Sequence, residues 1–200
     1  GSDISNLTYS ASPAMEPFGS FPAVLGHEIL GRVKSVGTNV SKMSQGQRVT
    51  VDPMISCTTR GYPPEDPCSS CSEGLHCTCE RAGEDGVTLI GDEPLSRGLT
   101  IGYHRDLPGG WGQTVLAHES QVFPVDDALS DNAAVLLEPL SIALHAVLRT
   151  PPEGEEPAFV IGSGTIALAT IWALRATGFQ GPILAQAKRE HEQKLARTLG

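Results

Sequence analysis

The chain has 200 residues, of which 40% are hydrophobic, and its formal net charge is −9 at pH 7. This composition supplies enough apolar material for a packed core, and the acidic balance argues against a nucleic-acid or anionic-membrane surface, which would need clustered Lys and Arg. The longest apolar stretch, TIALATIWAL, is about half a membrane span, and the N-terminus lacks the basic start of a signal peptide. We therefore expect a soluble, cytoplasmic protein without nucleic-acid or membrane partners.

The first part of the chain predicts turn-rich β structure. Gly and Pro are concentrated before residue 125, around short β-like runs such as GRVKSVG, RVTVDP and GQTVLAHESQVFPV. The triplet Gly-His-Glu at residues 26–28 stands just before the first of these runs. Taken alone, the pair His27 and Glu28 carries little information, because an isolated histidine is more often a core residue than a metal ligand.

All 5 cysteines lie between residues 57 and 79. This clustering, in a chain without an export signal, favours a thiolate metal site over a disulfide framework. Four thiolates form a closed zinc site with no open position for substrate, so the ion would stabilise the fold. The expected ligands are Cys57, Cys68, Cys71 and Cys79. Three alternatives stay open: unliganded or redox-active cysteines, Cys77 in place of Cys79, or His76 in place of one thiolate.

The second part of the chain predicts helices and parallel strands. The run LSDNAAVLLEPLSIALHAVLR has helical spacing, with Ser130 or Asp131 as its N-cap, and PPEGEEP follows as an exposed connection. AFVIGSGTIALATIWALRATG then predicts a strand, a glycine turn and a helix, and PILAQAKREHEQKLARTLG repeats strand and helix. A βαβα fragment cannot close a parallel sheet alone, so we expect that the chain has been cut short.

The glycine turn indicates a dinucleotide site. Gly162, Gly164 and Ala167 follow an apolar strand and begin a helix, where they permit a tight turn, close approach of a pyrophosphate and close helix packing. The second strand is followed by Lys188 and Arg189 rather than a carboxylate. Two cations suit a 2′-phosphate, which favours NADP over NAD. Alternatively, the two cations are a solvated helix start with Glu190 reaching back, or the turn binds no nucleotide.

The Gly-His-Glu triplet, the later four-cysteine lobe, an isolated Glu-Pro and the GxGxxA turn together resemble the zinc-dependent medium-chain alcohol dehydrogenase family across the whole chain. The resemblance implies an α/β protein in which a GroES-like, β-rich catalytic domain precedes a Rossmann cofactor domain. The implied boundaries are residues 1–130 for the catalytic domain with its zinc-binding lobe at 57–79, 131–155 for a connecting helix and linker, and 156–200 for a partial Rossmann domain. The full-length protein is expected to be a homo-oligomer.

The same resemblance implies a catalytic zinc ion. His27 matches the histidine ligand, and Glu28 matches an acid that sits beside the metal or exchanges with water on it. Glu138 in LLEPL matches the third ligand of the polyol, sugar and threonine dehydrogenase branches. Because a residue before proline is pushed out of helical geometry, we expect Glu138 to project sideways from its helical run.

The family's first zinc ligand is a cysteine followed by Gly-Ser-Asp or a close variant. Gly1, Ser2 and Asp3 match the residues after that cysteine, which would then stand immediately before Gly1. We therefore expect truncation at both ends and an inactive fragment, unless the first two residues are a cloning remnant. In the intact enzyme Ser2 would relay the proton and Asp3 would orient His27.

The expected reaction is the oxidation of a small secondary alcohol, polyol or sugar, or the reverse carbonyl reduction. Zinc would lower the pKa of the alcohol hydroxyl, and a hydride would pass to the nicotinamide of NADP or NAD. Two other functions stay open: a non-catalytic zinc-stabilised module or inactive relative, and, ranked lower, a zinc-free quinone or enoyl reductase. His145 is expected to pack on a helix, and His104, His118 and His191 are expected at the surface.

Overall fold

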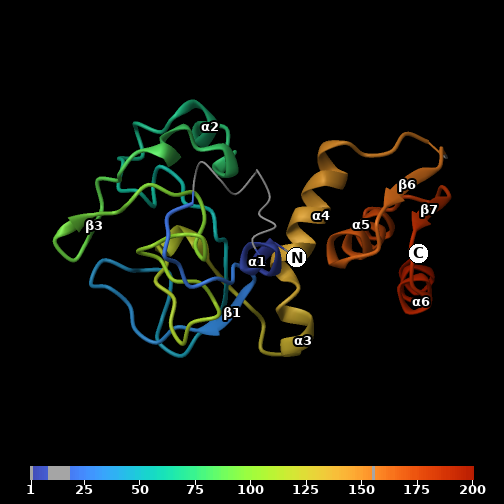
Figure 1. Ribbon diagram of the computed structural model, residues 1–200, viewed down its shortest axis with the longest axis horizontal. Helices are drawn as coiled ribbons and strands as arrows, with labels where there is room; N and C mark the ends of the chain where they lie inside the picture. Colours follow the sequence, from blue (N-terminus) through green and yellow to red (C-terminus); the bar gives the residue numbers. More distant parts are fainter. Residues whose placement is uncertain (1, 9–18, 155) are drawn as a thin grey trace. The chain divides into compact units, whose positions relative to one another are not determined.

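The computed structural model describes residues 2–8, 19–154 and 156–200, which form two compact units, Gly1–Val135 and Leu136–Gly200 (Figure 1). Gly1, to which the expectation of a preceding cysteine ligand is attached, lies outside the described residues. Within the described residues no helix is both long and apolar enough to cross a bilayer. Each unit has its own apolar core.

A three-stranded antiparallel sheet forms the centre of the first unit. Its order is β1 (Ile29–Arg32), β2 (Arg48–Val51) and β5 (Val122–Pro124). Ile29 pairs with Val51, and Val51 in turn pairs with Val122. Branched residues suit this pleated, half-buried surface. The apolar core beside the sheet consists of Ile29, Val51, Ile55, Leu95, Ile101 and Leu107.

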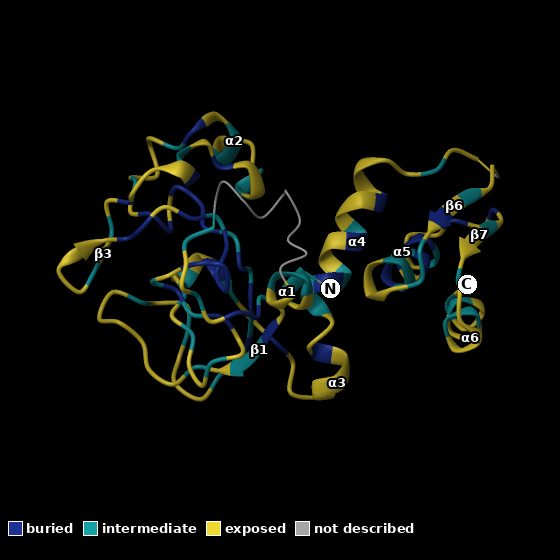
Figure 2. Cartoon of the chain, in the orientation of Figure 1, coloured by how far each residue is buried: buried dark blue, intermediate teal, exposed yellow. Residues whose placement is uncertain are grey.

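The rest of the first unit consists of short elements separated by turns, as its Gly and Pro content predicts. Helical pieces are α1 (Ser2–Leu7), α2 (Ser69–Ser72), η2 (His76–Thr78), η3 (Glu80–Gly83), η4 (Glu119–Gln121) and α3 (Asp131–Ala134). The strands β3 (Leu89–Ile90) and β4 (Glu93–Pro94) form a two-stranded hairpin, which is largely exposed (Figure 2). Short elements bury little apolar surface each, so this lobe depends on other interactions for its order.

The second unit begins a parallel α/β sheet. Its elements are α4 (Leu137–Arg149), β6 (Ala158–Ile161), α5 (Thr165–Ala176), β7 (Ile183–Gln186) and α6 (Glu190–Leu199). β6 and β7 pair in parallel, with Ala158 opposite Ile183 and Ile161 opposite Gln186. The crossover helix α5 is buried through Ala169, Ile171, Ala173 and Leu174, which pack with Ala143 and Val147 of α4. The prediction that this part of the chain forms the start of a Rossmann-like parallel sheet is confirmed.

The helical run after residue 130 is two helices rather than one. Ser130 caps α3, as its sequence position predicts, and its Oγ accepts a hydrogen bond of 3.3 Å from Ala133 N. An uninterrupted helix would place the ring of Pro139 against the carbonyl of Val135 and leave that carbonyl without a donor. The chain therefore turns at Val135, and α4 restarts with Pro139 in its first turn, where a missing N–H costs nothing.

This arrangement corrects the expectation for Glu138, which is helical and lies in the first turn of α4. His104 is a second correction, because it is fully buried rather than at the surface. Its Nε2 lies 2.8 Å from the carbonyl oxygen of Ser96, and its Nδ1 accepts a hydrogen bond of 3.1 Å from Asp106 N. His145, expected to pack on a helix, is exposed.

Candidate metal and cofactor sites

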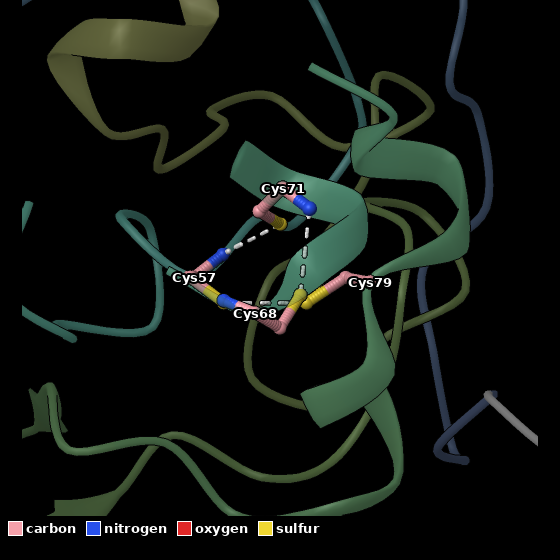
Figure 3. A group of neighbouring side chains, drawn as sticks. All are labelled: Cys57, Cys68, Cys71 and Cys79. Carbon is pink, nitrogen blue, oxygen red and sulfur yellow. Dashed lines mark hydrogen bonds between the residues drawn. The ribbon is translucent and has the colours of Figure 1, made fainter. Parts of the chain in front are cut away.

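Four cysteines of the first unit converge on one point. One ligand atom from each of Cys57, Cys68, Cys71 and Cys79 lies within 4.8 Å of the others. Figure 3 shows Cys71 on the α2 ribbon, Cys68 beside it, and Cys57 and Cys79 approaching from other segments. Cys68 is the N-cap of α2, so the turn of this short helix sets the spacing of Cys68 and Cys71. Cys77 is exposed and outside the group.

The spacing of these sulfur atoms suits a tetrahedral zinc ion. Thiolates at about 2.3 Å from zinc are about 3.8 Å from one another in a tetrahedron. The Sγ atoms of Cys57 and Cys79 are 3.8 Å apart. That distance is nearly twice a disulfide bond of about 2.05 Å, so this pair does not have the geometry of a disulfide.

Backbone amides point at the sulfur atoms, an arrangement that stabilises thiolates. Cys68 N donates to Cys57 Sγ at 3.4 Å, Cys57 N to Cys71 Sγ at 3.5 Å, and Cys71 N to Cys68 Sγ at 3.5 Å (Figure 3). Burial raises the pKa of the Cys68 thiol, but the amides of Cys71 and Glu80 outweigh it and lower the pKa to about 7. Burial raises the pKa of Cys71 and Cys79.

A buried cation lies beside this cluster. Arg60 is fully buried, and its guanidinium donates to the carbonyl oxygens of Glu84 at 2.9 Å, Ala82 at 3.5 Å and Gly98. Burial lowers the pKa of Arg60, and the neighbouring Cys79 raises it. Its carbonyl acceptors are neutral, and Cys79, Tyr62 and Cys57 are the neighbouring groups whose negative charge would stabilise a buried guanidinium. The donor set and the nearby cation therefore both fit a metal-bound tetrathiolate.

A second group of polar residues surrounds the Gly-His-Glu triplet, which immediately precedes β1. Gly26 has φ +101, and a Cβ there would lie 2.7 Å from Trp111 Cδ1, so only glycine fits. Its amide donates to Asp3 Oδ1 at 3.3 Å. His27 follows with its imidazole largely covered, and Glu28 is exposed. Glu28 also lines a hollow of about 420 Å³ with Asp131 and other residues of this unit.

Asp3 lies against His27. Asp3 Oδ2 is 3.3 Å from His27 Nδ1, an ion-pair distance without the alignment of a hydrogen bond. The carboxylate therefore spans the backbone amide of Gly26 and the imidazole of His27. A histidine whose Nδ1 faces a carboxylate presents Nε2 as the free ligand atom, which is the usual arrangement of a metal-binding histidine. Ser2, the expected relay residue, begins α1 directly before Asp3.

Tyr103 belongs to the same group, although no sequence motif marks it. Its side chain is 2% exposed, and its ring centroid is 5.4 Å from that of His27 at an interplanar angle of 39°. Burial raises the pKa of the Tyr103 hydroxyl to about 12, and Ser2 and Asp3 are among the groups that act on it. Since 76 positions separate Tyr103 from His27, no local spacing signals this contact.

Glu138, the third expected ligand of the catalytic metal, belongs to the second unit. It is an acidic residue of the first turn of α4, and its carbonyl oxygen accepts a hydrogen bond of 2.7 Å from Ser141 Oγ. This hydrogen bond fixes the backbone at the start of the helix.

The glycine turn of the second unit connects β6 to α5. Gly162 has φ +126, a conformation that L side chains rarely adopt, and a Cβ there would lie 3.7 Å from the Cβ of Ala167. Gly164 is the N-cap of α5, with φ −77, and a Cβ added there would have no other atom within 4 Å. The free amides of a helix N-terminus attract anions, so a glycine turn at the start of α5 is compatible with a bound phosphate group.

Beyond β7, one carboxylate organises the start of α6. Glu192 Oε2 accepts hydrogen bonds from Ser163 Oγ at 2.8 Å and from Arg189 N at 3.1 Å. The Ser163 hydroxyl, followed by the Arg189 amide, lowers the pKa of Glu192. Arg189 Nη1 lies 3.5 Å from Glu192 Oε1, whereas Lys188 forms no ion pair with any residue that the structure describes. The two expected 2′-phosphate contacts therefore differ in their surroundings.

Comparison with known proteins explains why a four-cysteine cluster, the polar group around His27 and a glycine turn occur in one chain. Residues 1–127 match the alcohol dehydrogenase GroES-like domain. The chain belongs to the zinc-type medium-chain alcohol dehydrogenase family. Within this family its relatives include sugar, polyol and threonine dehydrogenases.

L-galactonate-5-dehydrogenase of Escherichia coli is 31% identical over 178 residues, which cover 88% of this chain and 44% of that protein. (R,R)-butanediol dehydrogenase of Saccharomyces cerevisiae is 29% identical over 187 residues, which cover 90% of this chain and 44% of that protein. Among solved structures, a zinc-binding dehydrogenase of Sinorhizobium meliloti bound to NADP has a TM-score of 0.68 and 28% identity, covering 91% of this chain and 45% of that one. The chain thus spans about half the length of these members of the alcohol dehydrogenase family.

Proposed function

We propose that the intact protein is a zinc-dependent dehydrogenase that transfers a hydride between a secondary alcohol, polyol or sugar and NADP, with NAD as the alternative cofactor. The observation that carries the proposal is the placement of Asp3 Oδ2 at 3.3 Å from His27 Nδ1. This contact leaves Nε2 of His27 for a metal. It also gives the Gly-His-Glu triplet a chemical role that an ordinary core histidine lacks.

In this proposal His27 binds a catalytic zinc ion, with Glu138 as a second ligand and Glu28 as a ligand or neighbour. The ion, when bound, supplies a Lewis acid that lowers the pKa of an alcohol hydroxyl. Asp3 holds the imidazole in one orientation and stabilises its Nδ1–H tautomer. The hydroxyl of Ser2 carries the proton between the alcohol and solvent.

The four clustered cysteines hold a second, structural zinc ion. Cys57, Cys68, Cys71 and Cys79 are all protein ligands, so no position is open for substrate. The lobe around them consists of short helices and a small hairpin, which contribute little core of their own. Zinc binding can contribute on the order of 10 kcal/mol to the folding of such a lobe. We assign this ion a stabilising role.

The glycine turn binds the dinucleotide. Gly162 permits the turn, Gly164 lets the pyrophosphate approach the N-terminus of α5, and Ala167 keeps the helix close to the strand. Lys188 and Arg189 face the 2′-phosphate of NADP in this proposal. The NADP complex of the Sinorhizobium meliloti relative supports the choice of cofactor class. A homo-oligomeric state of the full-length protein stays a prediction.

Metal analysis of the full-length protein tests the proposal. We expect two zinc ions per chain, one of which is lost in His27→Ala and the other in Cys68→Ser. Cys77→Ser, which changes the exposed cysteine, is the matched control and should keep both ions. One ion in the unaltered protein, insensitive to His27→Ala, would support the non-catalytic zinc module instead.

An activity assay then addresses the chemistry. The full-length protein should reduce NADP in the presence of polyols, sugar acids or simple secondary alcohols, and His27→Ala should abolish this activity. Retention of hydride transfer after removal of the zinc bound by His27 would support a zinc-free reductase and contradict the proposal.

A further inference from the structure

Tyr103 is held rigidly beside His27. Its amide donates to the carbonyl oxygen of Thr100 at 3.1 Å, and its own carbonyl oxygen accepts from Ser20 N at 3.0 Å. The neighbouring Gly102 donates to Leu107 at 3.2 Å. Backbone contacts on both sides therefore fix the direction in which the tyrosine side chain leaves the chain.

The ring of Tyr103 covers the imidazole of His27. The 5.4 Å between the two ring centroids lies within the range of attractive aromatic pairs, about 4.5–7 Å. Asp3 occupies the Nδ1 edge of the same imidazole. With a carboxylate at one edge and an aromatic ring against it, His27 cannot rotate about χ2 without losing one of the two contacts.

The hydroxyl of Tyr103 is buried among the polar groups of α1. Ser2, Asp3 and Asn6 are the side chains that act on it, and within the described residues its oxygen makes no hydrogen bond of standard geometry. A buried hydroxyl without a hydrogen-bond partner costs free energy, and such groups are uncommon in folded proteins. Even with an ordinary tyrosine pKa of about 10, the hydroxyl is protonated at neutral pH and is available as a donor.

We propose that Tyr103 is a positioning residue for His27: its ring fixes the plane of the imidazole, and its buried hydroxyl lies among the polar side chains of α1 that include Ser2 and Asp3. Together with Asp3, it keeps Nδ1 protonated and directs the Nε2 lone pair toward the metal. The metal part of this inference rests on the proposed function. The orientation of His27 does not, because all the contacts that produce it belong to the first unit.

Two substitutions separate the contributions of ring and hydroxyl. Tyr103→Phe keeps the ring, and Tyr103→Leu removes both ring and hydroxyl. The tautomer of His27 is read from its imidazole ¹⁵N shifts at one neutral pH, in full-length protein that keeps the structural zinc ion of the four cysteines but has lost the metal bound by His27. We expect one dominant Nδ1–H tautomer in the unaltered protein, a partial mixture in Tyr103→Phe and a larger one in Tyr103→Leu. An unchanged tautomer in both variants overturns the inference.

Metal affinity gives a second readout. Competition with a chelator should show zinc binding at the His27 site about 10-fold weaker in Tyr103→Phe and up to about 100-fold weaker in Tyr103→Leu, the range for residues that orient a ligand. Affinity at the four-cysteine site is the internal control and should stay constant. Equal weakening at both sites indicates general destabilisation and overturns the positioning role.

The two proposals fail in different ways. If His27→Ala leaves the zinc content unchanged, the proposed function falls, whereas a changed tautomer in Tyr103→Leu still supports the positioning of His27. If His27→Ala removes one zinc ion and both Tyr103 variants keep the original affinity and tautomer, the function stands and the role of Tyr103 falls.

Discussion

The hydroxyl of Ser163, inside the glycine turn, donates a hydrogen bond of 2.8 Å to Glu192 Oε2 in the first turn of α6. The same carboxylate oxygen accepts from the amide of Arg189. One side chain thus joins the turn expected to hold the pyrophosphate to the segment expected to hold the ribose. Glu192 also pairs with Arg189, whereas Lys188 forms no ion pair within the described residues, so we expect Lys188 to contribute more than Arg189 to binding of a 2′-phosphate.

Substitution of Lys188 by Ala should therefore weaken NADP binding more than NAD binding. A charge-assisted contact contributes about 1.5–3 kcal/mol, so we expect a loss of about 10-fold or more in NADP affinity and little change for NAD. Titration of both cofactors into the full-length protein measures this difference. Lys194→Ala, which removes an exposed lysine farther along α6, is the control of equal charge. Equal losses for both cofactors would contradict the NADP preference.

Gly162 and Gly164 should differ when each is replaced by Ala. Gly162→Ala forces a side chain into φ +126 and should destabilise the second unit by about 1–3 kcal/mol. Gly164→Ala meets no atom within 4 Å and has φ −77, so the free protein should tolerate it. Its Cβ would still hinder a pyrophosphate, so cofactor affinity should fall. Chemical denaturation and cofactor titration of both variants separate strain from binding, and unchanged affinity in Gly164→Ala would remove the pyrophosphate from this turn.

Arg60→Met should destabilise the cysteine lobe. The change removes the donors to the carbonyl oxygens of Glu84, Ala82 and Gly98 and the cation beside the thiolates. Unsatisfied buried acceptors cost about 1–3 kcal/mol, so we expect a loss of roughly that size, together with easier removal of zinc by a chelator. Arg97→Met, which changes an exposed arginine in the same lobe, is the control. Zinc release at the original rate in Arg60→Met would show that the lobe does not need this charge.

His104 should make stability fall in mild acid. Burial lowers its pKa in the folded protein, with hydrogen bonding to Ser96 and the charge of Asp106 opposing the shift. The unfolded chain binds a proton near the ordinary pKa of about 6.5, whereas the folded protein binds one only at lower pH. The contribution of His104 to the free energy of unfolding is therefore complete above about pH 6.5. It is lost as the pH falls below that value, by up to about 1.4 kcal/mol per pH unit.

Urea denaturation of the zinc-loaded protein between pH 7.5 and 5.5 measures this dependence. His104→Gln keeps a donor for Ser96 and should flatten the profile relative to the unaltered protein. His145→Gln removes an exposed histidine and is the matched control. A profile as steep in His104→Gln as in the original protein would assign the acid sensitivity to other groups.

Features of the sequence that depend on local spacing predicted the structure well. The Cys68-x2-Cys71 turn, the Ser130 cap and the strand, glycine turn and helix around Gly162 each lie within a few residues, so backbone geometry alone relates their parts. Pro139 was the exception. Its effect on the preceding carbonyl breaks the helical run at Val135 and returns Glu138 to a helix, which the preference of a residue before proline did not reveal.

By itself, the sequence determined the two-part architecture, the cysteine lobe and the glycine turn between strand and helix, because periodicity, ligand spacing and glycine positions are written along the chain. Only the tertiary structure decided which residues surround His27 and which charges are buried. Tyr103 reaches the imidazole from another loop, Arg60 lies inside the cysteine lobe, and His104 is enclosed rather than exposed. These contacts depend on how distant segments pack, and burial sets the free energy of a polar group only after that packing has formed.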